Sequence, residues 1–124
     1  KDTGIRHRAY NDAAGTTAAF NLNSLSHLNT ITGADFDLSR FRHVAFYNEQ
    51  DSRIEMHLES HVDQAISMAG EQICLAAGER ILTEYSYKYT LEGFAELAAR
   101  AGLAASEHWV DDARLFSLQY FTAV

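Results

Sequence analysis

The chain has 124 residues, 47% of them hydrophobic and 22% charged, which is the composition of an ordinary globular domain. Its formal net charge of −7 disfavours nucleic acids and anionic membranes as partners. It has one cysteine and no apolar run as long as a membrane span, so we expect a cytoplasmic protein without internal disulfides.

A long helix is predicted over residues 9–31, "AYNDAAGTTAAFNLNSLSHLNTI". Its apolar residues recur at steps of three and four and predict one buried stripe. The stripe residues are Ala14, Ala18, Leu22, Leu25 and Leu28. Asn11 or Asp12 can cap the start of this helix, and Gly33 can take the left-handed conformation at its end. The next stretch, "FDLSRF", is expected to form a connector of one helical turn.

Two strands are predicted after the connector, because the helical period of the apolar residues ends there. They are residues 41–48, "FRHVAFYN", and residues 53–60, "RIEMHLES", joined by "EQDS". In the second strand Ile54, Met56 and Leu58 share one face, and His57 is expected to be solvated on the other. Three shorter strands follow within residues 64–89, broken at two glycines, Gly70 and Gly78. Among them, Cys74 in "ICLAA" is expected to be a small buried side chain.

The C-terminal part is predicted to hold a second helix and further strands. Thr90 can cap the helix "LEGFAELAARAG", and Gly102 can end it. Its expected buried stripe consists of Phe94, Leu97, Ala98 and Ala101. After it, "SEHWVDD" indicates a turn and "LFSLQYFTAV" two strands. The predicted fold class is α+β, with a long helix and antiparallel strands followed by a last helix and an antiparallel strand pair.

Common motifs for nucleotides, hydrolysis and metals are missing from the sequence. It contains no GxG, so no glycine-rich loop can bring the backbone against a phosphate or a nucleotide ribose. GxSxG, CxxC and HExxH are missing as well. His57 and His61 are four residues apart, but they fall on a strand and its end rather than on a helix. We therefore expect no metal site.

Four segments together resemble a known family. They are "AYNDAAGTTAAFNLN", "GADFDLSRFRHVAFYN", "RIEMHL" and "AGERILTEYSYKYT". In this order and spacing they are similar to the C-terminal part of the S-adenosylmethionine (SAM)-dependent histidine Nα-methyltransferases, the ergothioneine-pathway enzymes and their close homologues. The resemblance implies that residues 1–88 are a substrate-binding lobe and residues 89–124 a C-terminal remnant of a class I methyltransferase sheet.

The resemblance also implies which residues hold the substrate. Glu84 and Ser86, in "TEYS", match the residues that contact the imidazole ring. Tyr10 matches a tyrosine at the amino-acid end of the substrate, while Phe20 and Met56 match apolar pocket positions. A surface ion pair for Glu84, a helix-start contact for Tyr10 and ordinary core roles for the two apolar residues remain alternatives. All five are binding residues, and no catalytic residue is expected.

The resemblance places the SAM-binding strands N-terminal to this segment. The chain by itself is therefore expected to lack the SAM site and to be inactive, as part of a longer enzyme. The alternative is a non-catalytic α+β binding or structural module derived from the same family. Loss of neighbouring strands would expose an apolar C-terminal surface, which predicts a homodimer or a swapped arrangement. The residues of that surface are Trp109, Phe116, Leu118 and Tyr120.

Overall fold

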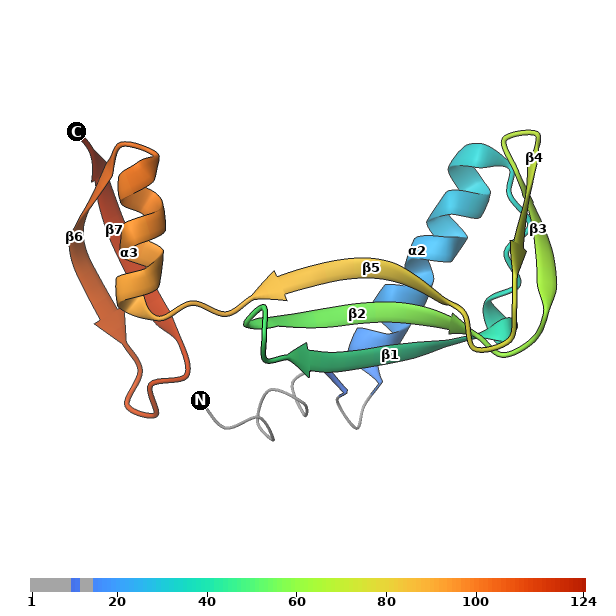
Figure 1. The fold of residues 1–124 in the computed structure, drawn as a ribbon, viewed down its shortest axis with the longest axis horizontal. Helices are drawn as coiled ribbons and strands as arrows, with labels where there is room; N and C mark the ends of the chain where they lie inside the picture. The colour runs from blue at the N-terminus through green and yellow to red at the C-terminus, as the bar shows by residue number, and fades with distance from the viewer. Residues whose placement is uncertain (1–9, 12–14) are drawn as a thin grey trace. The chain divides into compact units, whose positions relative to one another are not determined.

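A computed structural model describes residues 10–11 and 15–124 of the chain. The chain divides into two compact units, the first ending at Tyr87 and the second comprising Lys88–Val124. Each unit combines helix and antiparallel strands (Figure 1), so the predicted α+β class is confirmed. None of the helices in the described ranges is long and apolar enough to cross a membrane.

The first unit contains one long helix, a short 3-10 helix and five strands. These are α2 (Thr16–Thr32), η1 (Leu38–Arg40), β1 (Phe41–Asn48), β2 (Arg53–Ser60), β3 (Gln64–Met68), β4 (Glu71–Leu75) and β5 (Arg80–Tyr87). A three-stranded antiparallel sheet has the order β1-β2-β5, and β3 and β4 form a separate hairpin. The strand bounds agree with the sequence prediction, and the predicted helical turn is η1.

The ends of α2 differ in how well the sequence predicted them. At the C-terminal end Gly33 has φ 67° and its N–H donates to the Asn29 carbonyl, which confirms the predicted cap. At the N-terminal end Gly15 caps the helix without a side-chain hydrogen bond. The predicted cap Asn11 instead donates from Nδ2 to the Ala45 carbonyl at 3.0 Å. The other candidate cap, Asp12, lies outside the described residues.

The core of the first unit forms where α2 packs against one face of the three-stranded sheet. Its largest cluster of buried side chains consists of Leu25, Phe36, Phe41, Leu58, Ile66 and Leu75. Leu22 and Leu28 pack against this cluster, which confirms that part of the predicted helix stripe; Ala14 lies outside the described residues.

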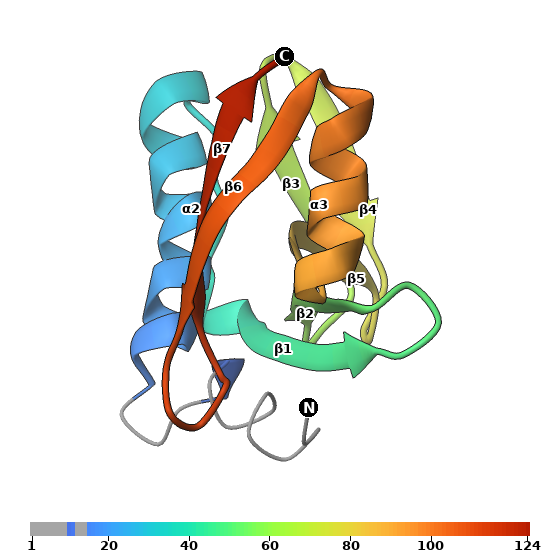
Figure 2. The same cartoon turned by 90° about the vertical axis from the view of Figure 1, so that its left-hand side faces the viewer.

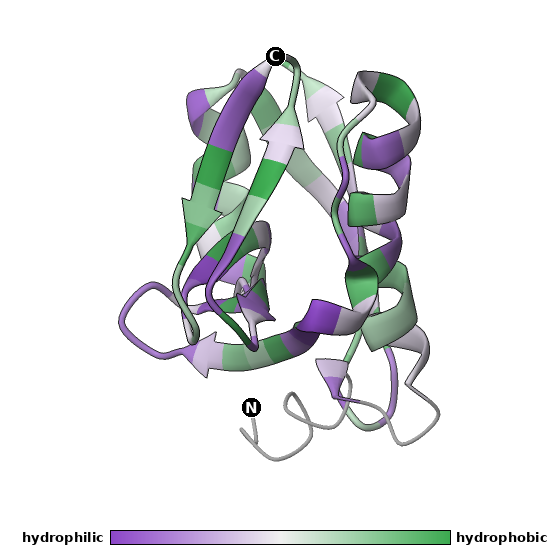
Figure 3. Cartoon of the chain, turned by 90° about the vertical axis from the view of Figure 1, so that its right-hand side faces the viewer, coloured by the Kyte–Doolittle hydropathy of each residue, from purple (hydrophilic) through white to green (hydrophobic). Residues whose placement is uncertain are grey.

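In the β3–β4 hairpin, hydrophobic and hydrophilic residues are interspersed (Figure 3). Leu75 is buried there while Cys74 is exposed, so the prediction for Cys74 was wrong; adjacent strand residues face opposite sides.

The pairing of β2 with β5 contains a shift that the sequence pattern did not predict. Met56 lies opposite Glu84, but the next residue of β2, His57, lies opposite Leu82. Thr83 is therefore an extra residue, as in a β-bulge, and its hydroxyl donates to the Met56 carbonyl at 2.9 Å. The shift places Glu84 on the same face of the sheet as Ile81.

The other face of this sheet is charged but well packed. The side chain of His57 is only 12% exposed, and its ring stacks on Phe46 with centroids 5.4 Å apart. The expectation of a solvated His57 was therefore wrong, because a neighbouring aromatic side chain covers it. Glu59 is also buried on this face, where it accepts hydrogen bonds from Arg42 and Arg80.

The second unit consists of α3 (Leu91–Arg100), β6 (Leu103–Val110) and β7 (Ser117–Ala123). The helix packs beside the β6–β7 hairpin (Figure 2). The Thr90 hydroxyl accepts the Gly93 N–H at 3.0 Å, so the predicted cap is confirmed. Ala98 is buried as predicted, but Leu97 is 43% exposed, so the predicted stripe is only partly correct.

The predicted turn "SEHWVDD" and the two strands after it were wrong in their bounds. Residues 106–110 belong to β6, and β7 is a single strand. The hairpin turn instead lies between Val110 and Ser117, where an Asp111 carboxylate oxygen accepts the Phe116 N–H at 2.6 Å. Strand pairing across the hairpin decided the bounds here, and a single-strand pattern does not contain that information.

Candidate functional site

Four of the five predicted site residues meet on the sheet face that α2 covers. Across the strands, Met56 lies opposite Glu84, and Ile54 lies opposite Ser86. Tyr10 packs against the buried cluster that contains Ile54 and Met56. The structure thus brings an aromatic hydroxyl, a thioether, a carboxylate and an aliphatic hydroxyl to adjacent positions.

Tyr10 and Ser86, 76 positions apart in sequence, are in direct contact. The Tyr10 hydroxyl lies 2.8 Å from Ser86 Oγ, a hydrogen bond in which either group can donate. Tyr10 precedes α2, and contacts with β1 hold its segment. The His43 ring Nε2 lies 2.9 Å from the Tyr10 carbonyl oxygen, and the next residue, Asn11, donates to the Ala45 carbonyl.

Glu84 and Ser86 share one face of β5, and the two tyrosines beside them point to the other. On that other face the Arg53 guanidinium lies 3.7 Å from the centroid of the Tyr85 ring and donates to the Tyr87 hydroxyl at 2.9 Å. Glu84 and Ser86 therefore lie on the face of β5 opposite to Tyr85 and Tyr87. The side chain of Glu84 is exposed, whereas Met56 opposite it is buried. The carboxylate is thus reachable from solvent at the margin of a packed apolar surface.

Phe20 is the predicted site residue that the structure leaves apart from these contacts. It lies in α2 and is 66% exposed, so it is not part of the core stripe. Ser24, one helical turn further on, lines the same pocket as Thr83 of β5. Residues four apart lie on one side of a helix, so Phe20 belongs to the flank of α2 that is directed towards β5.

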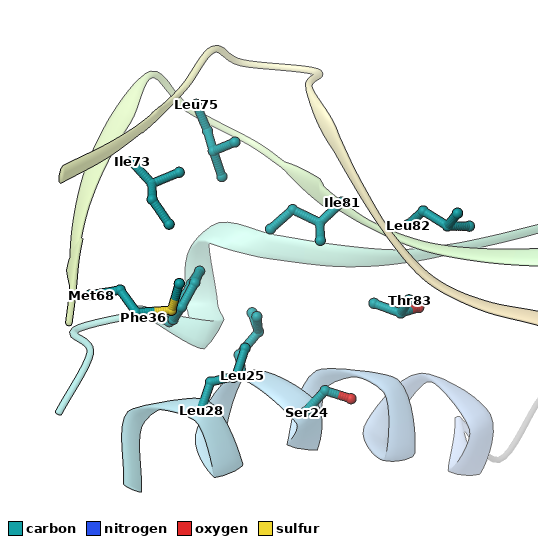
Figure 4. A pocket seen from close by; sticks show the side chains of 10 residues that line it. All are labelled: Ser24, Leu25, Leu28, Phe36, Met68, Ile73, Leu75, Ile81, Leu82 and Thr83. Carbon is teal, nitrogen blue, oxygen red and sulfur yellow. The ribbon is translucent and has the colours of Figure 1, made fainter. Parts of the chain in front are cut away.

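Next to this site lies an apolar pocket of about 400 Å³ (Figure 4). It is lined by Ser24, Leu25, Leu28, Phe36, Met68, Ile73, Leu75, Ile81, Leu82 and Thr83. None of the five predicted site residues lines it, although Thr83 directly precedes Glu84. This pocket could not be predicted from the sequence, because its walls come from α2, the segment that follows it, the β3–β4 hairpin and β5. Its apolar walls suit an apolar group rather than the charged ends of an amino acid.

The carboxylates on the opposite face of the sheet have structural partners. Hydrogen bonds from Asn48 and Arg53 lower the pKa of Glu55. Hydrogen bonds from two arginines, Arg80 first and then Arg42, lower the pKa of Glu59. Burial lowers the pKa of His57, so its ring takes up a proton less readily than an exposed histidine. The neighbouring donors keep these carboxylates ionised. The charged groups on this face therefore have a structural role in the sheet.

Comparison with known proteins shows which family this chain resembles. Residues 1–123 match the family described as "Histidine-specific methyltransferase, SAM-dependent". Two similar proteins are both named "Histidine N-alpha-methyltransferase". The one from Mycolicibacterium smegmatis is 46% identical and the one from Mycobacterium tuberculosis 38% identical, each over 120 residues.

The match covers the chain and the relatives unequally. It includes 95% of this chain but only 37% of either relative. The chain therefore spans a little over a third of the length of these proteins.

Proposed function

The chain belongs to the SAM-dependent histidine-specific methyltransferase family, and we propose that it supplies the amino-acid pocket of an N-methyltransferase that acts on the α-amine of histidine or a similar amino acid. The observation that carries the proposal is the meeting of Tyr10, Met56, Glu84 and Ser86 on one face of the three-stranded sheet. Family membership alone would not require these side chains to be adjacent.

Glu84 and Ser86 suit the two nitrogens of an imidazole ring. A carboxylate accepts one ring N–H through a charge-assisted hydrogen bond. A hydroxyl can donate to the second nitrogen or accept from it, whichever tautomer the ring adopts. Side chains two residues apart on a strand are spaced by about 6.5–7 Å, which leaves room for a five-membered ring between them.

Tyr10 and the two apolar residues complete the proposed pocket. A phenol can hold the substrate carboxylate without adding charge. The serine hydroxyl can keep its hydrogen bond to Tyr10 while it contacts the ring, because it offers one donor and two acceptor positions. Met56 forms a buried apolar floor beneath Glu84, and the exposed ring of Phe20 provides apolar surface that a ligand can cover.

The methyl donor in this proposal is SAM, which supplies a methyl group bound to a sulfonium. The residues in this chain do not fit a SAM site of the usual kind. The sequence lacks a glycine-rich loop, and the strands within the described ranges are paired only antiparallel. The role of this chain is then to position the α-amine, and positioning is a large part of catalysis for such a transfer.

A chimaera tests the proposal, with this chain replacing the matched segment of the M. smegmatis relative. Glu84→Ala removes a charged hydrogen-bond partner worth about 1.5–3 kcal/mol, so histidine affinity should fall about ten- to a hundredfold. Ser86→Ala removes a neutral partner and should cost about 0.5–1.5 kcal/mol. Tyr85→Asn, on the opposite face, should leave affinity nearly unchanged. Glu71→Ala is a matched control, since it removes an exposed strand glutamate elsewhere in the same unit.

Calorimetric titration of histidine, with thermal melts to check folding, would rank these variants. If Glu84→Ala binds as tightly as the parent chimaera while Tyr85→Asn does not, the substrate-pocket proposal fails. The alternative is a non-catalytic binding or structural module derived from the family. In that case the unmodified chimaera would fold but would transfer no methyl group to histidine.

A further inference from the structure

A buried asparagine interrupts the apolar face of α2. Asn21 is 2% exposed and lies one helical turn before Leu25, which is part of the core. A buried amide is costly unless its hydrogen bonds are satisfied. Asn21 Nδ2 lies 3.1 Å from the His57 carbonyl oxygen of β2 and 3.0 Å from the ring Nδ1 of His43 on β1.

These contacts fix the direction of every hydrogen bond in the group. The His57 carbonyl can only accept, so the Asn21 atom facing it is the donating amide nitrogen. That nitrogen also faces His43 Nδ1, which must therefore accept. In a neutral ring the proton is then on Nε2, and Nε2 lies 2.9 Å from the Tyr10 carbonyl oxygen. A single chain of donors thus runs from Asn21 through His43 to Tyr10.

We propose that Asn21 and His43 are positioning residues for Tyr10. Asn21 holds the His43 ring in the Nε2–H tautomer, and that ring anchors the backbone of Tyr10. The anchor sets where the phenol meets Ser86, 2.8 Å away. The claim that this serves a substrate rests on the proposed function, whereas the anchoring of Tyr10 stands on the contacts themselves.

The segment before α2 is attached to β1 at two residues, Tyr10 and Asn11. Tyr10 lies before the first residue of α2, so the hydrogen bonds of that helix do not fix it. Asn11, bound to the Ala45 carbonyl, is a second point of attachment to β1. These two contacts, to the alternate β1 residues His43 and Ala45, fix both the position and the direction of this short segment. Small displacements of positioning groups can cost up to about a hundredfold in rate.

The tautomer can be measured directly in the unchanged 124-residue chain. Long-range ¹H–¹⁵N spectra distinguish a protonated ring nitrogen from an unprotonated one. We expect the neutral His43 ring to carry its proton on Nε2 and none on Nδ1. A protonated Nδ1 in the unchanged chain would overturn the proposal, and this measurement does not depend on any variant folding.

Asn21→Asp keeps the shape of the side chain but removes the donor. The introduced carboxylate can only accept, so His43 should become protonated at Nδ1 and the signals of Tyr10 should shift. Asn23→Asp is the matched control, because Asn23 is an exposed residue of the same helix. An unchanged His43 tautomer in folded Asn21→Asp protein, or equal Tyr10 shifts in both variants, would refute the positioning role.

Kinetics in the chimaera separate this inference from the proposed function. Asn21→Asp should lower kcat/KM for histidine about tenfold or more, with little change in the KM for SAM, and Asn23→Asp should not. If Glu84→Ala weakens histidine binding while Asn21→Asp leaves kcat/KM unchanged, the pocket stands and the positioning role fails. If Asn21→Asp shifts Tyr10 but neither Glu84→Ala nor Asn21→Asp affects histidine, the anchor stands and the substrate role fails.

Discussion

The hydrogen bond between Tyr10 and Ser86 provides a sharp test of the site, because it joins the segment before α2 to the last strand of the sheet. We expect Tyr10→Phe and Ser86→Ala to be energetically coupled in a double-mutant cycle. Each variant removes one hydroxyl and leaves its partner in place. The two groups lie 2.8 Å apart in a partly buried setting, so the contact is shielded from water on one side.

The magnitude follows from the cost of one neutral hydrogen bond, about 0.5–1.5 kcal/mol of unfolding free energy. Both residues make further contacts, so each single variant can cost more than this bond alone. The double variant isolates the pair, since the shared bond is lost only once. We therefore expect the double variant to cost about 0.5–1.5 kcal/mol less than the sum of the two single variants.

Denaturant unfolding followed by circular dichroism gives the required free energies. The single tryptophan, Trp109, lies in the second unit, so its fluorescence provides an internal control. The variants should change the transition of the first unit and leave the transition seen by Trp109 fluorescence in place. Strictly additive costs would show that Tyr10 and Ser86 do not interact, and the site as described would then be wrong.

Two further predictions concern other parts of the chain. Burial lowers the pKa of His57, so the unfolded chain binds a proton at this residue more readily than the folded one. The free energy of unfolding should therefore be highest above the ordinary histidine pKa of about 6.5 and should fall as the pH drops below it. The melting temperatures at pH 7.5 and pH 5.5 should differ less in His57→Gln than in the parent. The Glu55 carboxylate opposes the lowering of the His57 pKa and Arg80 adds to it. An equal difference in melting temperature in both proteins would contradict this assignment. In the second unit, Trp109, Leu118 and Tyr120 are exposed, and we expect them to be covered in a dimer of the chain. Sedimentation should show Leu118→Ser shifting that dimer towards monomer, and a parent chain that is monomeric at high concentration would refute the expectation.

The strands of the first unit could be predicted because their signals are local. Apolar and polar residues alternate clearly in β2, and a short polar turn separates it from β1, so the bounds of both strands followed from the sequence. The caps at Gly33 and Thr90 were also predictable, because each depends on the chemistry of one residue. The start of α2 was not, since the candidate cap Asn11 found a partner on β1 instead. Whether Asn11 caps the helix or binds to β1 depends on tertiary contacts.

Burial was harder to predict than secondary structure, because it depends on what lies over each face. Cys74 has apolar neighbours, but it faces outward from a two-stranded hairpin. His57 looked like a solvated strand residue, but Phe46 from the adjacent strand covers its ring. In α2 the three- and four-residue spacing places Asn21 on the same side as Ala18 and Leu25, but a polar side chain alone gives no reason to expect burial. Its partners on β1 and β2 are 22 and 36 residues away in sequence.

The site residues depend on a feature of β5 that alternation cannot show. If the strand were regular from Ile81 onward, Thr83, Tyr85 and Tyr87 would share its core face, and Ser86 would point away from Tyr10. Shifting the whole strand by one residue would turn Ser86 towards Tyr10 but would turn Ile81 away from the core. Exposing a large aliphatic side chain in this way costs up to about 1.5–3 kcal/mol.

The extra residue at Thr83 removes this conflict. It lets Ile81 pack in the core at one end of the strand and Ser86 meet Tyr10 at the other. It also keeps Tyr85 against Arg53 on the opposite face. A regular β5 strand could make either the contact of Ile81 with the core or the contact of Ser86 with Tyr10, but not both. The bulge thus aligns the candidate pocket with the core.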